Sequence, residues 1–148
     1  MSMMFLIAAT MLAAPTTAET DAMFAAAGGV RRGKAWTMCR EDPRATMRVD
    51  LNRDLNGDGR KDVIVVEDSA RCYGAAGTSF VLIASQPGGK WKKMLGSVGP
   101  AEVLDQRRGV GNWPDISVGG QGFCFPVLRW NGHSYANHRR EYLGKPCR

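Results

Sequence analysis

The sequence predicts a small, mainly β protein that carries one short N-terminal helix. Glycine is abundant, at 18 of 148 residues, which is typical of a chain with many turns. Two short apolar runs, VIVV at 63–66 and FVLI at 80–83, are flanked by Gly, Ser or Pro and therefore resemble buried strands. An Asn-Gly pair at 131–132 separates VLRW at 127–130 from HSY at 133–135, which predicts a hairpin with a type I′ turn.

The first 18 residues differ from the rest of the chain. Residues 1–18 contain no Asp, Glu, Lys or Arg, and an apolar run over 3–14 is followed by Pro15 and Thr-Thr-Ala. This pattern predicts a secretory signal peptide that is cleaved after Ala18. The run of about 12 residues is shorter than the ~20 that a membrane-spanning helix needs. We therefore expect no transmembrane segment and a mature chain that is periplasmic or secreted.

The mature chain divides into a lead-in and a β domain. Residues 19–27 are rich in Ala, begin with acidic residues and end at Gly28-Gly29, which predicts a short helix stopped by glycine. The helix and lead-in cover 19–47, and the β domain covers 48–148. Within the β domain, Pro87-Gly88-Gly89 predicts a hairpin turn into a strand over 91–95.

The four cysteines are predicted to form disulfides. An exported chain folds in an oxidising compartment, and no CxxC pair of the kind that binds zinc is present. Four cysteines allow three pairings. We favour Cys39 with Cys72 and Cys124 with Cys147, because each pairing joins sequence neighbours. Either loop would then stabilise the fold by about 3 kcal/mol in the chain-entropy model.

A weak internal repeat of about 53 residues divides the β domain into two units, 48–100 and 101–148. The segment DVIV at 62–65 corresponds to DISV at 115–118, and Cys72 and Cys124 follow the two segments. In each unit a further apolar strand, a turn and an aromatic-bearing strand come next. The economical interpretation is two copies of one β-hairpin unit.

One segment has the composition of a metal-binding loop. In DLNGDGRKD at 54–62, oxygen-bearing side chains occupy positions 1, 3, 5 and 9, which are Asp54, Asn56, Asp58 and Asp62. Glycines at positions 4 and 6 permit a tight turn, and the carbonyl of Arg60 at position 7 would complete the set. Three carboxylates held this close repel one another unless a cation lies between them. The loop therefore predicts one Ca²⁺ site, whose main role is to fix a turn.

The loop has three alternative interpretations: an EF-hand, a metal site in an upstream frame, and a turn without an ion. An EF-hand requires a Glu at position 12 and a following helix, but position 12 is Val65 and strand formers follow Asp62. An upstream frame that starts at Asp50 and Asn52 also alternates correctly. It has Leu55 where the glycine of the sharp turn belongs, so we rank it second. A turn without any ion is the third possibility.

The pattern DxNxDGxxD followed by an apolar strand resembles the calcium loop of FG-GAP and VCBS repeats, the β-hairpin units of integrin propellers and of many exported bacterial proteins. The resemblance implies two units like incomplete propeller blades, with Ca²⁺ bound by the five residues named above. In the second copy the corresponding positions are Arg107, Gly109, Gly111 and Asp115. Three ligands are lost there, so we expect no metal in that copy, with Asp115 kept for backbone hydrogen bonding.

These features favour an exported calcium-binding β module with a binding or structural role in the cell envelope, and no enzymatic activity is assigned. A cell-wall or glycan hydrolase is one alternative, and it would need Glu102, Asp105 or one of His133 and His138 in a cleft. A periplasmic inhibitor or immunity protein is another. The formal charge of +6 favours acidic partners, so we expect an envelope protein or an anionic glycan. We expect no nucleic acid partner, because the chain is predicted to be exported.

Overall fold

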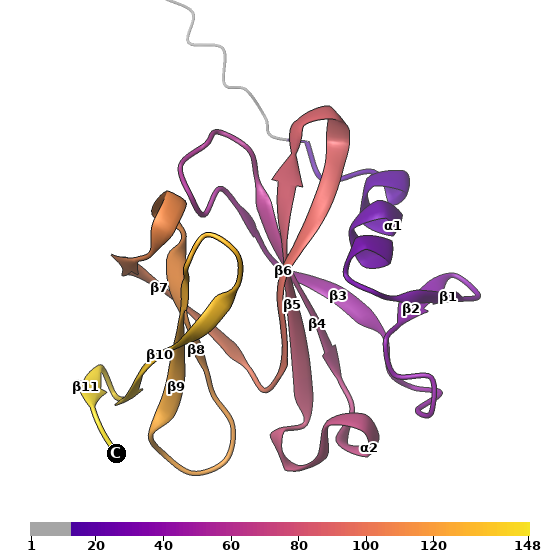
Figure 1. Cartoon of the computed structure of the whole chain (residues 1–148). Coiled ribbons are helices and arrows are strands. Elements are labelled where there is room, and N and C mark those ends of the chain that lie inside the picture. The colour runs from indigo at the N-terminus through magenta and orange to yellow at the C-terminus, as the bar shows by residue number, and fades with distance from the viewer. Residues whose placement is uncertain (1–12) are drawn as a thin grey trace, which may run out of the picture.

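The computed structural model describes residues 13–148, and the first 12 residues of the predicted signal peptide lie outside this part. The β elements dominate, as predicted, and the two α-helices are short (Figure 1). The elements in chain order are α1 (Thr17–Ala26), β1 (Val30–Arg32), β2 (Ala35–Thr37), β3 (Met47–Arg53), β4 (Asp62–Asp68), α2 (Ala70–Tyr73), η1 (Gly74–Ala76), β5 (Thr78–Gln86), η2 (Pro87–Gly89), β6 (Lys90–Val98), β7 (Ala101–Arg108), η3 (Val110–Asn112), β8 (Pro114–Val118), β9 (Phe125–Trp130), β10 (Tyr135–Tyr142) and β11 (Lys145–Pro146).

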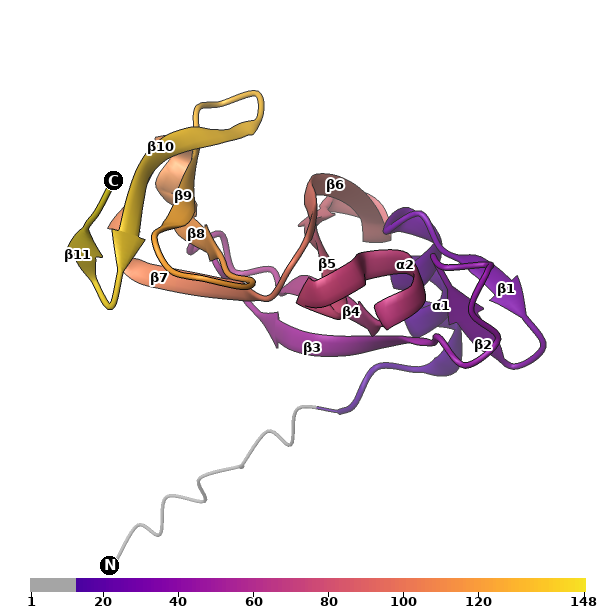
Figure 2. The same ribbon diagram turned by 90° about the horizontal axis from the view of Figure 1, so that it is seen from below.

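Two antiparallel meanders form the body of the protein. The first sheet has the order β3-β4-β5-β6, and the second has the order β7-β8-β9-β10, with β11 added at its edge. Strands that are consecutive in sequence are neighbours in each meander, although α2 and η1 lie between β4 and β5. The two sheets therefore have the same strand order and stand side by side like incomplete blades. The first sheet lies between the second sheet on one side and α1 on the other, as both views show (Figures 1 and 2).

The strand β4 explains why the first sheet has a neighbour on each face. Every residue from Asp62 to Glu67 is buried, and side chains alternate between the two faces of a strand. Ile64 and Val66 join the cluster between the sheets, together with Ile116 and Val118 of β8. Val63 and Val65 pack instead against Met23 and Phe24 of α1.

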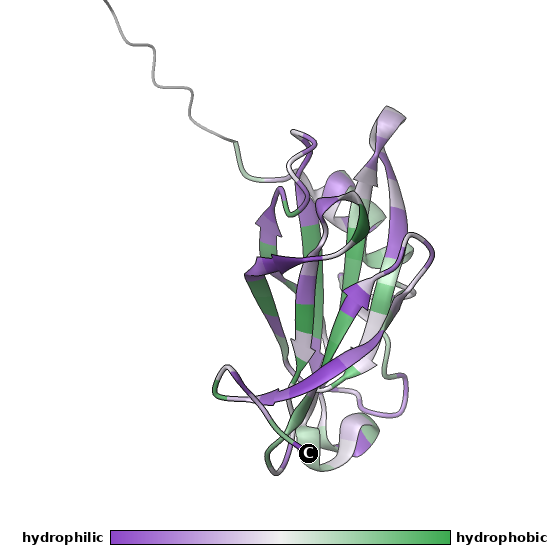
Figure 3. Cartoon of the chain, turned by 60° about the vertical axis from the view of Figure 1, so that its left-hand side comes forward, coloured by the Kyte–Doolittle hydropathy of each residue, from purple (hydrophilic) through white to green (hydrophobic). Residues whose placement is uncertain are grey.

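The second sheet has an apolar face and a polar face. Ile116, Leu128 and Trp130 belong to the core between the sheets. The opposite face, which we call the outer face, carries Asp115 and Arg129 in place of a second apolar cluster. The hydropathy colours show a related difference between the sheets, because the central strands β4 and β5 of the first sheet are largely green whereas β10 of the second is mostly purple (Figure 3).

Several local features confirm or correct the predictions. Both predicted disulfides, Cys39–Cys72 and Cys124–Cys147, are present, and Pro87–Gly89 joins β5 to β6. The 127–135 hairpin is confirmed, but the predicted two-residue type I′ turn at Asn131-Gly132 is wrong. Trp130 pairs with Tyr135, so the loop has four residues, and the Asn131 side chain accepts hydrogen bonds from the amides of His133 and Ser134.

The N-terminal helix begins earlier than predicted, at Thr17 instead of residue 19. A capping box explains this: the Thr16 hydroxyl accepts a hydrogen bond from the Glu19 amide, while the Glu19 carboxylate accepts one from the Thr16 amide. Such reciprocal bonds satisfy amides that have no partner inside the helix. The predicted cleavage after Ala18 therefore falls inside α1 and would remove the capping residue.

Candidate metal centre

The loop 54–62 connects β3 to β4, where strand β4 begins at Asp62. Gly57 and Gly59 both have left-handed backbone angles, with φ of 79° and 85°, which other residues adopt only with strain. The loop enters a strand and not a helix, as the comparison with EF-hands predicted. The two glycines therefore allow the loop to turn, and its last aspartate, Asp62, is the first residue of β4.

Asp54 organises the turn from inside. Its two carboxylate oxygens accept hydrogen bonds from the amides of Gly57 and Gly59, each at 2.8 Å. Burial pushes the pKa of Asp54 upward, but these amide bonds outweigh it and lower the pKa below its usual value. Asp54 is consequently ionised at neutral pH and already holds the loop in a closed turn.

The other side chains of the loop are nearer the surface. The Asn56 side-chain oxygen accepts a bond from the Asp58 amide at 3.3 Å, and the Asp58 carboxylate accepts one from the Arg60 amide at 2.8 Å. The Arg60 guanidinium lies 3.6 Å from the same carboxylate. The predicted oxygen donors are thus present on one short loop, with a single arginine at its rim.

Asp62 is the unusual member of the set, because it is fully buried. Its carboxylate accepts bonds from two neutral donors, the amides of Leu55 at 2.9 Å and Ser85 at 3.1 Å. Burial is the main cause that raises the pKa of Asp62 to about 6. The two amide bonds oppose this rise, and the negative charges of Asp58 and Asp54 add to it. At neutral pH this site therefore holds a buried negative charge with two like charges near it.

The donor set fits calcium in its chemistry, since every donor is an oxygen. The carboxylates are not gathered as tightly as a bound ion would require. Among residues 13–148, the one group of three Cys, His, Asp or Glu side chains with ligand atoms all within 4.8 Å is Cys39, Glu41 and Cys72. Both sulfurs of that group belong to a disulfide, so neither is the thiolate that binds metals.

The corresponding loop of the second sheet lacks the ligands, as predicted. Arg107 is exposed near the end of β7, and Gly109 and Gly111 have no side-chain oxygen that could bind a metal. Asp115 is fully buried like Asp62, but the prediction that it accepts backbone bonds is wrong. Its carboxylate is held by Arg129 through two bonds of 2.9 Å and by Arg139 at 2.6 Å. Burial favours the neutral form, but the two arginines prevail and lower the pKa of Asp115.

The loop 54–62 also fastens the two sheets together, which sequence reasoning missed. Arg108 of β7 donates to the Leu55 carbonyl at 2.7 Å, and the Asn112 side chain donates to the Asn56 carbonyl at 3.0 Å. A two-bond ion pair joins Arg53 to Asp105 nearby. Arg108 and Leu55 are 53 residues apart, which equals the repeat length, so the two corresponding loops lie against each other.

The residues considered for a hydrolase lie in different surroundings. Asp105 binds Arg53 at the junction of the sheets, whereas Glu102 borders a hollow on the outer face beside Phe125 and Glu141. His133 lies in the exposed turn after β9, and His138 lies on β10. The structure does not bring Glu102 and Asp105 together as a pair of acid and base groups.

Comparisons with protein-family models, with curated proteins and with solved structures found no match for this chain. In the part of the chain that the structure covers, no helix combines the length and the apolar character needed to cross a bilayer.

Proposed function

We propose that this protein is an exported calcium-binding β module with a binding or structural role in the cell envelope. Ca²⁺ would be held by the side chains of Asp54, Asn56, Asp58 and Asp62 and by the carbonyl of Arg60. The observation that carries the proposal is Asp62, a buried carboxylate that has neutral hydrogen-bond donors and two negative neighbours. A divalent cation is the missing positive charge.

The position of the loop gives the ion a structural role. Leu55 and Asn56 accept the hydrogen bonds that attach the second sheet, so fixing the loop also fixes the junction between the sheets. The two disulfides support export, because such bonds persist in oxidising compartments. The excess of basic residues supports an acidic partner in the envelope.

A chelation experiment tests the calcium site. Purified protein is melted with about 1 mM CaCl₂ and, in parallel, with an excess of EGTA. Calcium in about hundredfold excess over its Kd would stabilise the fold by about 2.7 kcal/mol. Asp58→Asn should remove this difference, because Asp58 is an exposed ligand whose loss disturbs little else.

Asp50→Asn is the matched control. Asp50 is an exposed acid on β3 that belongs to the second-ranked upstream frame and not to the 54–62 loop. The variant should keep the full calcium effect. Identical melting curves with calcium and with EGTA would refute the proposal, and loss of the effect in Asp50→Asn would move the site to the upstream frame.

A further inference from the structure

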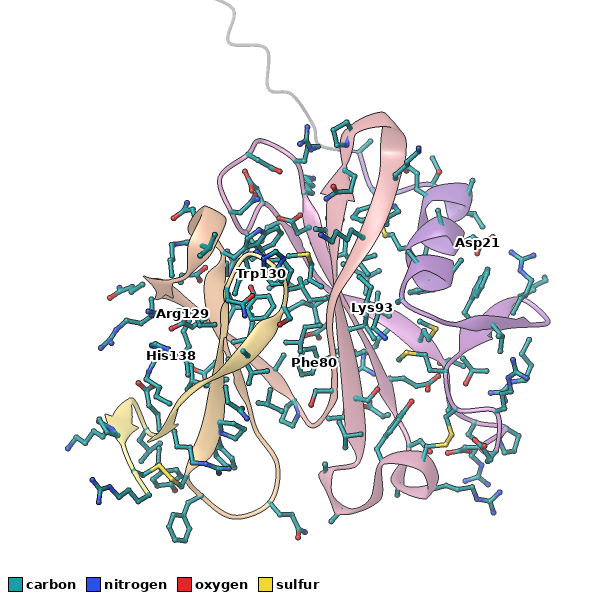
Figure 4. The ribbon with its side chains drawn as sticks, in the orientation of Figure 1. Asp21, Phe80, Lys93, Arg129, Trp130 and His138 are labelled. Atoms are coloured by element: carbon teal, nitrogen blue, oxygen red, sulfur yellow. A yellow bond between two sulfur atoms is a disulfide. The ribbon has the colours of Figure 1, made fainter. Side chains whose placement is uncertain are left out.

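The edge of the second sheet carries a feature that the calcium loop does not explain. Strand β10 pairs with β9 along its length but with β11 only through Glu141 and Tyr142. A β-bulge between Asn137 and Arg139 leaves His138 as the extra residue, and bulges redirect side chains at sheet edges. Figure 4 shows His138 and Arg129 on the side of the second sheet that faces away from the core residues Phe80 and Trp130.

Two hollows meet at this bulge and form one groove, which we call the β10 groove. Their volumes are ≈ 470 and ≈ 510 Å³, and Asn137 and His138 line both. The arginines that line the first hollow are Arg139, Arg140 and Arg148, and those that line the second are Arg108 and Arg129. No Asp or Glu lines either hollow, so the groove presents one sign of charge.

The arginines of the groove keep unused hydrogen-bond donors. Arg129 uses Nε and Nη2 for Asp115, which leaves Nη1. Arg139 binds Asp115 and Glu141 through Nη1 and Nε, and its Nη2 atom is buried without a partner. Because this Arg139 atom is shielded from solvent, the donor that these two side chains leave for a ligand is Nη1 of Arg129.

The charge of the groove exceeds what its internal ion pairs neutralise. The arginines contact three carboxylates, those of Asp105, Asp115 and Glu141. Arg140 has a single bond, to the Cys124 carbonyl, and Arg148 is exposed at the end of the chain. Arg140, whose guanidinium contacts no carboxylate, supplies excess positive charge of the kind that an anionic ligand requires.

We propose that the β10 groove binds an anionic glycan, with its acidic groups on the arginines and its hydroxyl groups on Asn131 and Asn137. Guanidinium groups form paired hydrogen bonds with carboxylate and phosphate oxygens. The Asn137 amide can both donate and accept. The Asn131 oxygen already accepts bonds from His133 and Ser134, so only the amide nitrogen of Asn131 is available to a hydroxyl group. Two adjoining hollows suit a chain that carries several acidic groups better than a single ion. This inference rests on the binding role proposed above and is independent of the calcium site.

Calorimetric titration with dextran sulfate, and with neutral dextran of equal length, tests the inference. Wild type should bind the sulfated polymer and not the neutral one, more weakly as salt is added. The double variant Arg140→Gln/Arg148→Gln should weaken binding by at least about tenfold, since two positive charges and their hydrogen bonds to the ligand are lost. Equal binding by this variant would overturn the proposal.

Arg40→Gln/Arg44→Gln is the matched control. Both arginines are exposed in the loop before β3, and the change in net charge is the same. This variant should bind within about twofold of wild type. A loss as large as in the groove variant would show that net charge alone is responsible, and would overturn the assignment to the β10 groove.

Three further arms separate the ligand from other polyanions and from the calcium site. Short sulfated oligosaccharides should gain affinity until they span both hollows, whereas affinity independent of length contradicts a groove. Tighter binding to duplex DNA or to vesicles of anionic lipid than to the sulfated glycan would overturn the choice of ligand. All titrations are repeated in EGTA: binding that persists while chelation leaves the melting curve unchanged supports the groove and refutes only the calcium site.

Discussion

Asp62 in the first sheet and Asp115 in the second occupy corresponding places in the repeat, and both are fully buried. Asp115 is surrounded by positive charge from Arg129 and Arg139. Asp62 meets two neutral amides and the negative charges of Asp54 and Asp58. Asp62 and Asp115 therefore occupy corresponding positions but have opposite electrostatic surroundings.

The difference shows how a buried carboxylate can be compensated in two ways. A buried ion needs a partner of opposite charge, because removal from water costs several kcal/mol. In the second sheet, Arg129 of β9 and Arg139 of β10 supply this partner. Among residues 13–148, no arginine pairs with Asp62 of the first sheet, so the compensation we propose is an external cation.

The largest expected effect comes from the second sheet. Asp115→Asn removes the negative charge shared by Arg129 and Arg139 and replaces one of its two acceptor oxygens with an NH2 donor that faces a guanidinium group. We expect the free energy of unfolding to fall by about 3 kcal/mol. Urea denaturation measures this change, and Asp105→Asn, at a half-exposed carboxylate, serves as the comparison. A loss below that of Asp105→Asn would contradict the role of the ion pairs.

The same substitution in the first sheet should have the opposite sign when calcium is absent. Asp62→Asn removes an uncompensated buried charge. The raised pKa implies that this charge lowers the free energy of unfolding by up to about 3 kcal/mol at neutral pH. An Asn loses one of the two accepted amide bonds, which costs about 1 kcal/mol. We therefore expect a gain of about 1–2 kcal/mol in EGTA and no response to calcium. A loss of stability in EGTA, as at Asp115, would remove the electrostatic contrast between the copies.

The pH dependence of stability should also differ between the two aspartates. The pKa of Asp62 is raised to about 6 in the folded protein, so its contribution is fully present below the ordinary pKa near 3.8 and is lost as pH rises through 6. The pKa of Asp115 is lowered, so its contribution is present at neutral pH and is lost in acid. Calcium-free protein should thus lose stability between pH 4 and 6 at up to about 1.4 kcal/mol per pH unit.

Urea denaturation at a series of pH values measures this slope. Asp62→Asn should abolish the loss between pH 4 and 6 and leave the decline in stronger acid. Saturating calcium should reduce the slope as well, because a bound cation keeps the carboxylate ionised. A slope that is unchanged in Asp62→Asn would assign the titration to another group.

Much of the fold was predictable because it depends on local pattern. The apolar runs that became β4 and β5, the glycines of the 54–62 loop and the pairing of neighbouring cysteines are visible in the sequence. The prediction of the turn type at 131–134 was wrong, because the Asn131 side chain accepts two backbone hydrogen bonds. These bonds stabilise a longer loop than the Asn-Gly pair predicts.

The partners of the site residues were less predictable, because they are distant in sequence. Asp115 meets Arg139 across 24 residues, and Leu55 meets Arg108 across 53. The repeat contained part of this information, since the two loops that correspond in sequence lie in contact. Nothing in the local sequence indicated that two arginines would surround Asp115, where the first sheet has an acidic loop beside Asp62.

The smallest expected effect concerns the surface ion pair at the junction of the sheets. Arg53 and Asp105 form two bonds of 3.1 and 2.9 Å, but both side chains are nearly half exposed, so water screens their attraction. A double-mutant cycle with Arg53→Gln and Asp105→Asn should give a coupling energy of about 0.5 kcal/mol. A coupling above about 2 kcal/mol would show that this pair, and not the loop bonded to Arg108, is the main attachment between the sheets. In that case calcium bound to the loop would have little effect on how the two sheets hold together.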